Sequence, residues 1–257
     1  VSLGVSQGYT TVVLAHIAFC TPYVVLSVMP RLQQMNPNIY EAALDLGATP
    51  FQALRKIIIP EMLRQIREGN PDADITILIA TGCHRRTTKD ELVNKFGPEI
   101  VAKEKIYIHD CDEREKLISI GTLPSGSDCE INTIAWEADL LVAEGFIEPH
   151  FFAGFSGGRK SVLPGVAGRT TVVSNHCSEF IAHPCARTGI LEGNPIHTDM
   201  LWAAKQAKLA FIVNVVLNSE KEAIYAVAGE VEQAHRKGTD FLFSLCGASA
   251  KEADVVI

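Results

Sequence analysis

The residues best suited to chemistry stand in one glycine-rich stretch, Glu148 to Gly165, which reads EPHFFAGFSGGRKSVLPG. Gly157 and Gly158 carry no side chain, so the backbone can approach a ligand closely and successive N–H groups can form a nest for an anion. Arg159 and Lys160 follow directly and add positive charge. The stretch is not a P-loop, because that motif needs glycine at the position of Arg159. It predicts an anion site, with a flexible glycine turn as the alternative.

Three histidines follow segments that we expect to be strands, namely His84, His150 and His176. Ligands of α/β sheets bind at the carboxyl ends of the strands, so these side chains are candidates for one site. Imidazole titrates near neutral pH and can act as an acid or as a base. A packing role alone does not explain a histidine at three strand ends.

The remaining histidines and the cysteines give weaker indications. His109 is expected in the core or at the surface, and His197 is expected to support a helix. His16 and His235 show no pattern that indicates a role. A further alternative is a zinc cluster formed by His176, Cys177, His183 and Cys185. Its spacing matches no familiar zinc ribbon or finger.

Three segments together resemble the nickel-pincer-dependent lactate racemase family. They are ATGCHR (residues 80–85), the stretch EGFIEPHFFAGFSGGRKSVLPG (residues 144–165) and the pair Asn175-His176, in the family's order and with compatible spacing. FAGFSGGRKS is a long and unusual string, so the motif is specific. The resemblance covers residues 61–257. It implies a racemase or epimerase that interconverts the enantiomers of lactate or a related 2-hydroxy acid by abstracting and returning a hydride.

The resemblance also implies a cofactor, which is nickel held by pyridinium-3,5-bisthiocarboxylic acid mononucleotide. Family members bind this nucleotide covalently through a lysine that corresponds to Lys160. His176 corresponds to the histidine that completes the square-planar nickel site, a geometry that suits Ni(II). His84 and His150 correspond to the acid and the base on opposite faces of the substrate carbon. The other residues expected to bind the cofactor are Ser156, Gly157, Gly158 and Arg159, with its phosphate held by the glycine loop and Arg159.

The segments that must position these groups alternate between strand-like and helix-like patterns. Strands are expected at residues 75–80, 105–110, 139–145, 170–175, 211–218, 223–229 and 254–257. Helices are expected at residues 61–70, 87–97, 131–138, 200–208 and 230–245, the second of them capped by Thr87 or Thr88. This alternation predicts an α/β fold with a mostly parallel, Rossmann-like sheet and helices on both faces.

The first 60 residues have a different character. Residues 9–29 carry no formal charge over about 20 residues, the length needed to cross a bilayer, with a buried core helix as the alternative. Residues 41–60 resemble the EAA loop of ABC-transporter permease subunits, especially polyamine importers. The resemblance rests on Glu41-Ala42-Ala43, Gly47, Ile57 and Pro60. We therefore expect two parts, a permease-like helical fragment over residues 1–60 and a racemase-like domain over residues 61–257.

Composition and charge exclude one class of partner and indicate a compartment. The net charge of −7 and the pI of about 5.6 argue against binding to nucleic acid, which needs clustered positive charge. The cysteines are scattered and never form C-x-x-C, which is typical of free thiols in a reducing compartment. We expect a cytoplasmic protein that meets a membrane only if residues 9–29 span it.

The resemblance to the racemase family is partial. The family's first strands and its second, substrate-closing domain have no counterpart here, so we expect a chimeric, truncated copy with impaired turnover. Two alternatives from different functional classes remain. One is a component of membrane transport, based on the first 60 residues, and the second is a module that binds the cofactor without catalysis.

Overall fold

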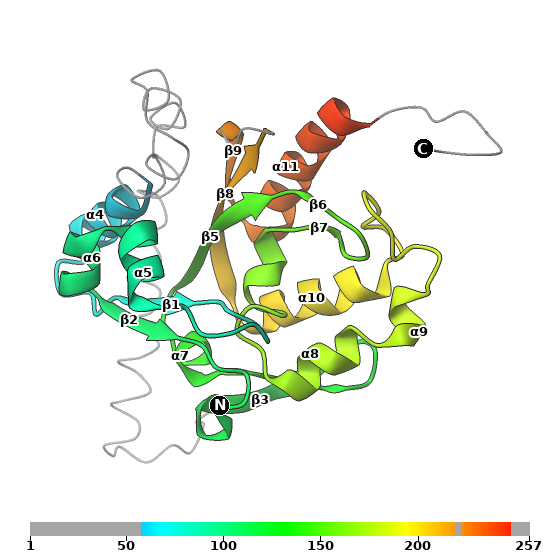
Figure 1. Ribbon diagram of the computed structural model, residues 1–257, viewed down its shortest axis with the longest axis horizontal. Coiled ribbons are helices and arrows are strands. Elements are labelled where there is room, and N and C mark those ends of the chain that lie inside the picture. The colour runs from blue at the N-terminus through cyan, green and yellow to red at the C-terminus, as the bar shows by residue number, and fades with distance from the viewer. Residues whose placement is uncertain (1–57, 219–222, 248–257) are drawn as a thin grey trace, which may run out of the picture.

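The structure is a computed structural model that describes residues 58–218 and 223–247 (Figure 1). The helices are α4 (Ile59–Gly69), α5 (Lys89–Phe96), α6 (Pro98–Lys103), α7 (Thr133–Trp136), α8 (Arg169–Asn175), α9 (Ser178–Ile181), α10 (Pro195–Gln206) and α11 (Val231–Cys246). The strands are β1 (Thr76–Ile79), β2 (Lys105–Ile108), β3 (Leu117–Thr122), β4 (Asp128–Asn132), β5 (Leu141–Ile147), β6 (Pro149–His150), β7 (Gly154–Phe155), β8 (Leu209–Leu217) and β9 (Ala223–Gly229). Short 3-10 helices are η2 (Arg114–Lys116) and η3 (Gly158–Ser161). The predicted α/β class is confirmed.

The central sheet has the strand order β5-β8-β9, with β5 parallel to β8 and β9 antiparallel to it. Strand β8 is almost entirely buried, as expected for a strand covered on both faces. The other described strands pair separately, β1 with β2 in parallel and β3 with β4 and β6 with β7 antiparallel. The prediction of one mostly parallel, Rossmann-like sheet is therefore wrong for the described residues. The physical reason is that β7 and β9 each follow their partner after a connection too short for a parallel crossover.

The strand predicted at residues 170–175 is also wrong, because this segment forms helix α8. Its β-branched residues suggested a strand, but such propensity yields to tertiary context. The N–H of Arg169 donates to the Cys111 carbonyl, and the hydroxyl of Thr171 accepts from the Glu130 N–H and donates to the Asp128 carbonyl. These contacts fix the helix against β4 and place His176 at its carboxyl end.

Among the described residues, two hydrophobic clusters hold the elements together. The larger one gathers residues of β4, β5, β8, α10 and α11, including the fully buried Ile131, Ile147 and Ile212. Helix α11 lies along β8 and β9, while α10 contacts both β8 and η3 (Figure 1). The smaller cluster joins α4 and α5 to β1 and β2. The larger cluster therefore lies beneath η3, the segment that carries Lys160.

Helix α5 begins as the sequence predicts. Thr88 accepts a hydrogen bond from the N–H of Glu91, and the Glu91 carboxylate accepts one from the N–H of Thr88. Such a capping box satisfies two amide groups that a helix start otherwise leaves free. The cap fixes where the segment after β1 ends and the helix starts.

Several predictions fall on residues outside the described part of the chain. They are the apolar run at residues 9–29, residues 41–57 of the segment that resembles an EAA loop, and the strand at residues 254–257. Across residues 58–218 and 223–247, none of the helices combines the length and the apolar character that crossing a bilayer requires.

Candidate active site

The loop that carries Lys160 is held tightly between β5, β8 and α11. Gly157 has φ +76° and ψ −179°, a conformation open essentially only to glycine. Gly158 has φ +54°, and a Cβ there would lie 2.8 Å from the ring of His235. The N–H of Gly158 donates to the buried Oδ1 of Asn214 at 2.7 Å, and the N–H of Ser156 donates to the Glu148 carbonyl at 2.8 Å. The amides of Ser156 and Gly158 are thus already bonded and the glycines allow tight packing, while an anion site at this loop stays a prediction.

Arg159 lies inside the domain and is only 1% exposed. Its guanidinium donates to the carbonyls of Ala153 at 2.8 Å, Gly157 at 3.2 Å and Ser156 at 3.3 Å. Its Nε donates to Nδ1 of His197 at 3.0 Å. The expectation that Arg159 contacts a cofactor phosphate is corrected here, because the guanidinium is buried and bonded to groups inside the domain.

Lys160 is half-buried beside this cation. Burial, and next the charge of Arg159, lower the pKa of the Lys160 ammonium to about 8. No carboxylate of the described residues forms an ion pair with it. About a tenth of the amine is therefore unprotonated at pH 7, far more than for an ordinary lysine, and the unprotonated amine is the nucleophilic form.

His150 stands in β6, close to Lys160. Its Nδ1 accepts a hydrogen bond from the N–H of Ala153 at 3.2 Å, so the proton of the neutral ring belongs on Nε2. The ring stacks on Phe151 with centroids 4.9 Å apart and meets the edge of Phe152 at 4.6 Å. Burial, followed by the charges of Lys160 and Arg159, lowers the pKa of His150 to about 4. The imidazole is thus neutral at pH 7.

His176 stands at the carboxyl end of α8 and also contacts Phe152. The two rings meet edge to face with centroids 5.0 Å apart. The Nδ1 of His176 lies 3.0 Å from the Val172 carbonyl, which can only accept, so Nδ1 carries the proton. Burial, and then the charge of Lys160, lower the pKa of the ring. The unprotonated Nε2 is therefore available as a metal ligand, and a backbone carbonyl holds the ring as is usual in metal sites.

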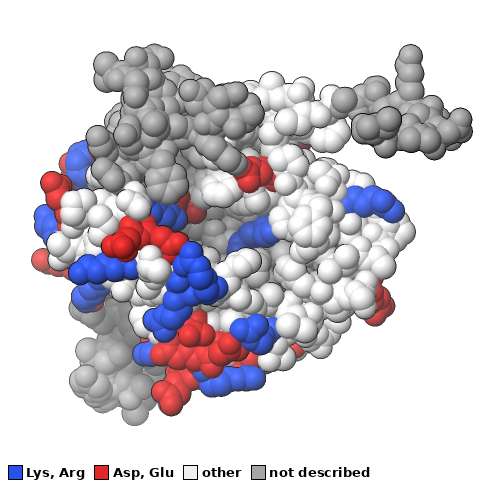
Figure 2. All heavy atoms as spheres, viewed as in Figure 1, with Lys and Arg blue, Asp and Glu red and all other residues white. Residues whose placement is uncertain are grey.

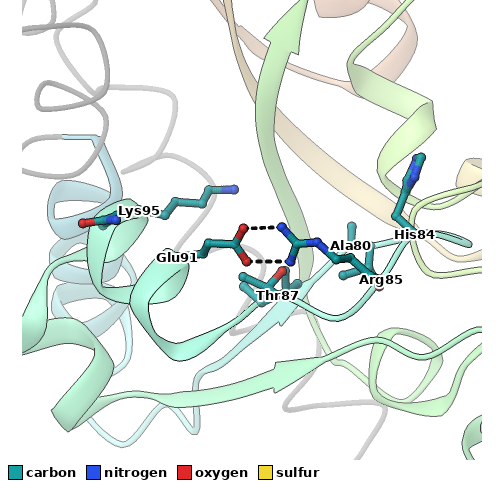
Figure 3. A pocket seen from close by; sticks show the side chains of 9 residues that line it. Ala80, His84, Arg85, Thr87, Glu91 and Lys95 are labelled. Carbon is teal, nitrogen blue, oxygen red and sulfur yellow. Dashed lines mark hydrogen bonds and ion pairs between the residues drawn. The ribbon is translucent and has the colours of Figure 1, made fainter.

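His84 is exposed and lies on the segment that follows β1. Its side chain lines an open cavity of about 600 Å³ together with residues of α5. In Figure 3 it points away from Arg85, which forms an ion pair with Glu91. The segment is tied to the Lys160 loop, because the N–H of Gly82 donates to the Gly165 carbonyl at 2.8 Å. Within the described residues, no side-chain contact joins His84 to His150, Lys160 or His176.

The face that holds these groups is divided in charge (Figure 2). Charged side chains of both signs gather over the part of this face formed by α5, β1 and β2, whereas the part over α8 to α10 is mostly uncharged. A hollow between the two parts is visible in the same view. Three of the predicted site residues, His150, Lys160 and His176, thus lie close to one another, and His84 lies on an adjoining segment.

Sequence reasoning missed the residues that support this site. His235 showed no pattern that indicates a role, but it is 3% exposed, packs against Gly158 and lies 2.9 Å from the Arg159 guanidinium. His197 supports Arg159 rather than only its own helix. The sequence also did not predict that Asn214, in the middle of an apolar strand, accepts a hydrogen bond from the Gly158 N–H. The pattern that could have indicated this contact is a polar residue within an otherwise apolar strand, because a buried side-chain amide needs a hydrogen-bond partner.

The roles of the remaining polar residues follow from where they lie. His109 is a core residue, bonded to the Ala167 carbonyl at 3.0 Å and to the Asn132 amide at 3.2 Å. A zinc cluster is not supported, because in the described part of the chain the potential ligands that converge are Asp110, Cys111 and Asp112. The cysteines and histidines between residues 176 and 185 do not converge on one point.

Comparisons with known proteins agree with this geometry. A family model described as the lactate racemase N-terminal domain matches residues 48–189. The lactate racemase of Thermoanaerobacterium thermosaccharolyticum is 56% identical over 202 residues, which are 79% of this chain and 47% of that protein. The solved structure of that racemase's apoprotein superposes with a TM-score of 0.73, covering 76% of this chain and 46% of that one. The chain thus spans about half the length of these relatives.

A second similarity concerns a different class of protein. The spermidine/putrescine transport system permease protein PotC of Haemophilus influenzae is 42% identical over 67 residues, which are 26% of this chain. The resemblance of part of the chain to a polyamine permease is therefore confirmed. It covers 26% of that protein's length.

Proposed function

The chain belongs to the lactate racemase N-terminal domain family, and we propose that it racemises lactate or a related 2-hydroxy acid. One observation carries the proposal. The rings of His150 and His176 both contact Phe152, the charge of Lys160 acts on both rings, and His176 presents an unprotonated Nε2. This set combines a nucleophilic anchor, a metal ligand and a group that moves protons, which are the parts that the reaction requires.

The same residues fit a nickel-pincer mononucleotide. A nucleotide attached through an amine needs a lysine that is partly unprotonated, and Lys160 meets this condition because burial and Arg159 lower its pKa to about 8. His176 would contribute the imidazole ligand to nickel. Ser156, Gly157 and Gly158 precede the anchor directly and are proposed to contact the cofactor through their backbone. When bound, the cofactor supplies an acceptor that takes a hydride from the substrate carbon and returns it.

The two remaining histidines move the hydroxyl proton. His150 is neutral at pH 7 with its proton on Nε2, so it is set to donate a hydrogen bond to the substrate oxygen, and it returns a proton only after taking one up itself. His84 lies on the segment docked at Gly165 and lines the open cavity. In one direction of the reaction His84 takes the hydroxyl proton and His150 returns one, and in the other direction the roles are exchanged.

Isotope labelling tests the reaction class directly. Lactate carrying deuterium on C2 is incubated with the cofactor-loaded protein, and the product enantiomer is analysed by mass spectrometry. If the C2 hydrogen moves as a hydride, deuterium stays in the product. If a base removes it as a proton, solvent hydrogen replaces deuterium, and the proposal of hydride transfer is wrong. The same assay with His84→Asn and His150→Asn tests their roles, and each should lower kcat.

The division of the chain is part of the proposal. We place a permease-like fragment at residues 1–60 and the racemase-like domain at residues 61–257, based on the EAA pattern and the family motifs. The match to the racemase family begins at residue 48. Sequencing the source DNA across codons 40–70 tests the division, since a shift in reading frame would mark the join and an unbroken frame would indicate a fusion.

A further inference from the structure

Arg159 is the largest side chain that is fully buried among the described residues. None of its partners there is a carboxylate, because it donates to three backbone carbonyls and contacts two histidines. A buried charge is costly to keep unless it is paired or fully hydrogen-bonded. Its position therefore needs an explanation beyond packing.

The two histidines hold the guanidinium from two different helices. Arginine can only donate, so its contact with His197, in α10, requires an unprotonated Nδ1 on that ring. The Nε2 of His235, in α11, lies 2.9 Å from the Arg159 guanidinium and 2.8 Å from the Ser156 carbonyl, which can only accept, so the tautomer of this ring decides which of the two contacts is a hydrogen bond. Burial, and then Arg159, lower the pKa of each ring to about 3. Both histidines thus stay neutral.

The carbonyls that Arg159 contacts belong to the two segments that carry reactive groups. The Ser156 and Gly157 carbonyls belong to the loop that presents Lys160. The Ala153 carbonyl belongs to the turn between β6 and β7, and the N–H of the same residue bonds to Nδ1 of His150. One guanidinium thus connects the anchor loop to the residue that sets the tautomer of His150.

We infer that Arg159, held between His197 and His235, is a positioning residue that couples the conformations of the Lys160 loop and the His150 turn and whose charge activates the Lys160 amine. Among the described residues, the groups that interact electrostatically with this amine are Arg159 on its own loop, His150 from β6 and His176 at the end of α8. Both histidines are neutral, so the cation next to Lys160 is the guanidinium. The inference rests on the proposed role of Lys160 as the anchor.

The test uses the full chain without cofactor or nickel. Lysines are trace-labelled with acetic anhydride across pH and quantified by peptide mass spectrometry, with the exposed Lys89 and Lys103 as internal references. Hydrogen exchange of the Ala153 amide is measured on the same samples. The variants are R159Q, which removes the charge, and R159K, which keeps the charge with fewer donors. H197Q keeps an acceptor and serves as the matched control.

In the wild type, Lys160 should label with a midpoint below that of the reference lysines. In R159Q the midpoint should move up to higher pH, and the Ala153 amide should exchange about tenfold faster, the factor expected for one lost hydrogen bond. R159K should keep the low midpoint while the amide still exchanges faster, a separation that a merely structural role would not produce. H197Q should change neither.

An unchanged Lys160 midpoint and an unchanged Ala153 exchange rate in R159Q would overturn the inference. If R159Q does not fold, R159K decides, because a midpoint that rises to the reference value despite the retained charge would equally refute it. Racemase activity does not enter this test. A chain that shows the expected labelling but never racemises lactate would count against the proposed function alone.

Discussion

Replacing Gly157 by alanine tests how tightly the anchor loop is held. Its φ of +76° and ψ of −179° cost about 1–3 kcal/mol for any residue with a Cβ. The new Cβ would lie 2.9 Å from Oδ1 of Asn214, 2.9 Å from Cγ1 of Ile147 and 2.9 Å from the Phe146 carbonyl oxygen. Overpacking of this kind costs about 1–3 kcal/mol more. Gly157→Ala should therefore lower the free energy of unfolding by about 2–6 kcal/mol.

Gly126→Ala is the matched control. Gly126 also has a positive φ, +95°, but a Cβ added there would meet nothing within 4 Å, so only the conformational cost applies. Urea unfolding, followed by far-UV circular dichroism, should place the midpoint of Gly157→Ala below that of the control by about 0.5–1.5 M, for an m-value of about 2 kcal/mol/M. Equal midpoints for the two variants would refute the claim that the loop is sterically fixed against β5 and β8.

Three further predictions concern single contacts. His235 is buried as a neutral ring with its pKa lowered to about 3, so it stabilises the fold above its ordinary pKa of 6.5 and this stability is lost as the pH falls from about 6.5 toward 3. In acid-unfolding experiments, His235→Gln should reduce the slope of the free energy of unfolding against pH by up to about 1.4 kcal/mol per pH unit. An unchanged slope would contradict the burial of His235 as a neutral ring. Asn214→Leu leaves the Gly158 N–H without its acceptor and should lower the free energy of unfolding by about 1–3 kcal/mol in urea, whereas wild-type stability would show that the bond contributes nothing. His176→Ala should remove nickel from the cofactor-loaded protein, measured by atomic emission, while the mass of the covalent adduct persists; full retention of nickel would exclude His176 as a ligand.

The sequence predicted elements well where the pattern was local. The capped helix at Thr88, the strand of residues 211–218 and helix α11 all form as their periodicity and capping residues indicate. It failed where distant contacts decide the outcome. Residues 170–175 have the pattern of a strand, yet hydrogen bonds from Arg169 to Cys111 and from Thr171 to β4 fix them as a helix. Sheet pairing failed for a related reason, since pairing depends on connections that periodicity does not report.

The sequence indicated candidate site residues but not the buried residues that hold them in place. The string FAGFSGGRKS resembles the racemase family, and this resemblance identified Lys160 and His150 as candidates. The role of Arg159 was predicted from its charge and corrected by its burial. His235 is 76 residues away from Arg159 in the chain, and no local pattern indicates that such a residue packs beneath the loop.

The proposed function depends above all on Lys160 as the anchor of the cofactor, and intact-mass analysis tests this role. The chain and its Lys160→Arg variant, which keeps the charge but lacks the amine nucleophile, are each produced together with the enzymes that make the nickel-pincer mononucleotide. We expect a cofactor-sized mass increase on the wild type alone, located by peptide mapping to residue 160. A wild type without the added mass, or an equal adduct on the variant, would contradict the assignment of Lys160 as the anchor.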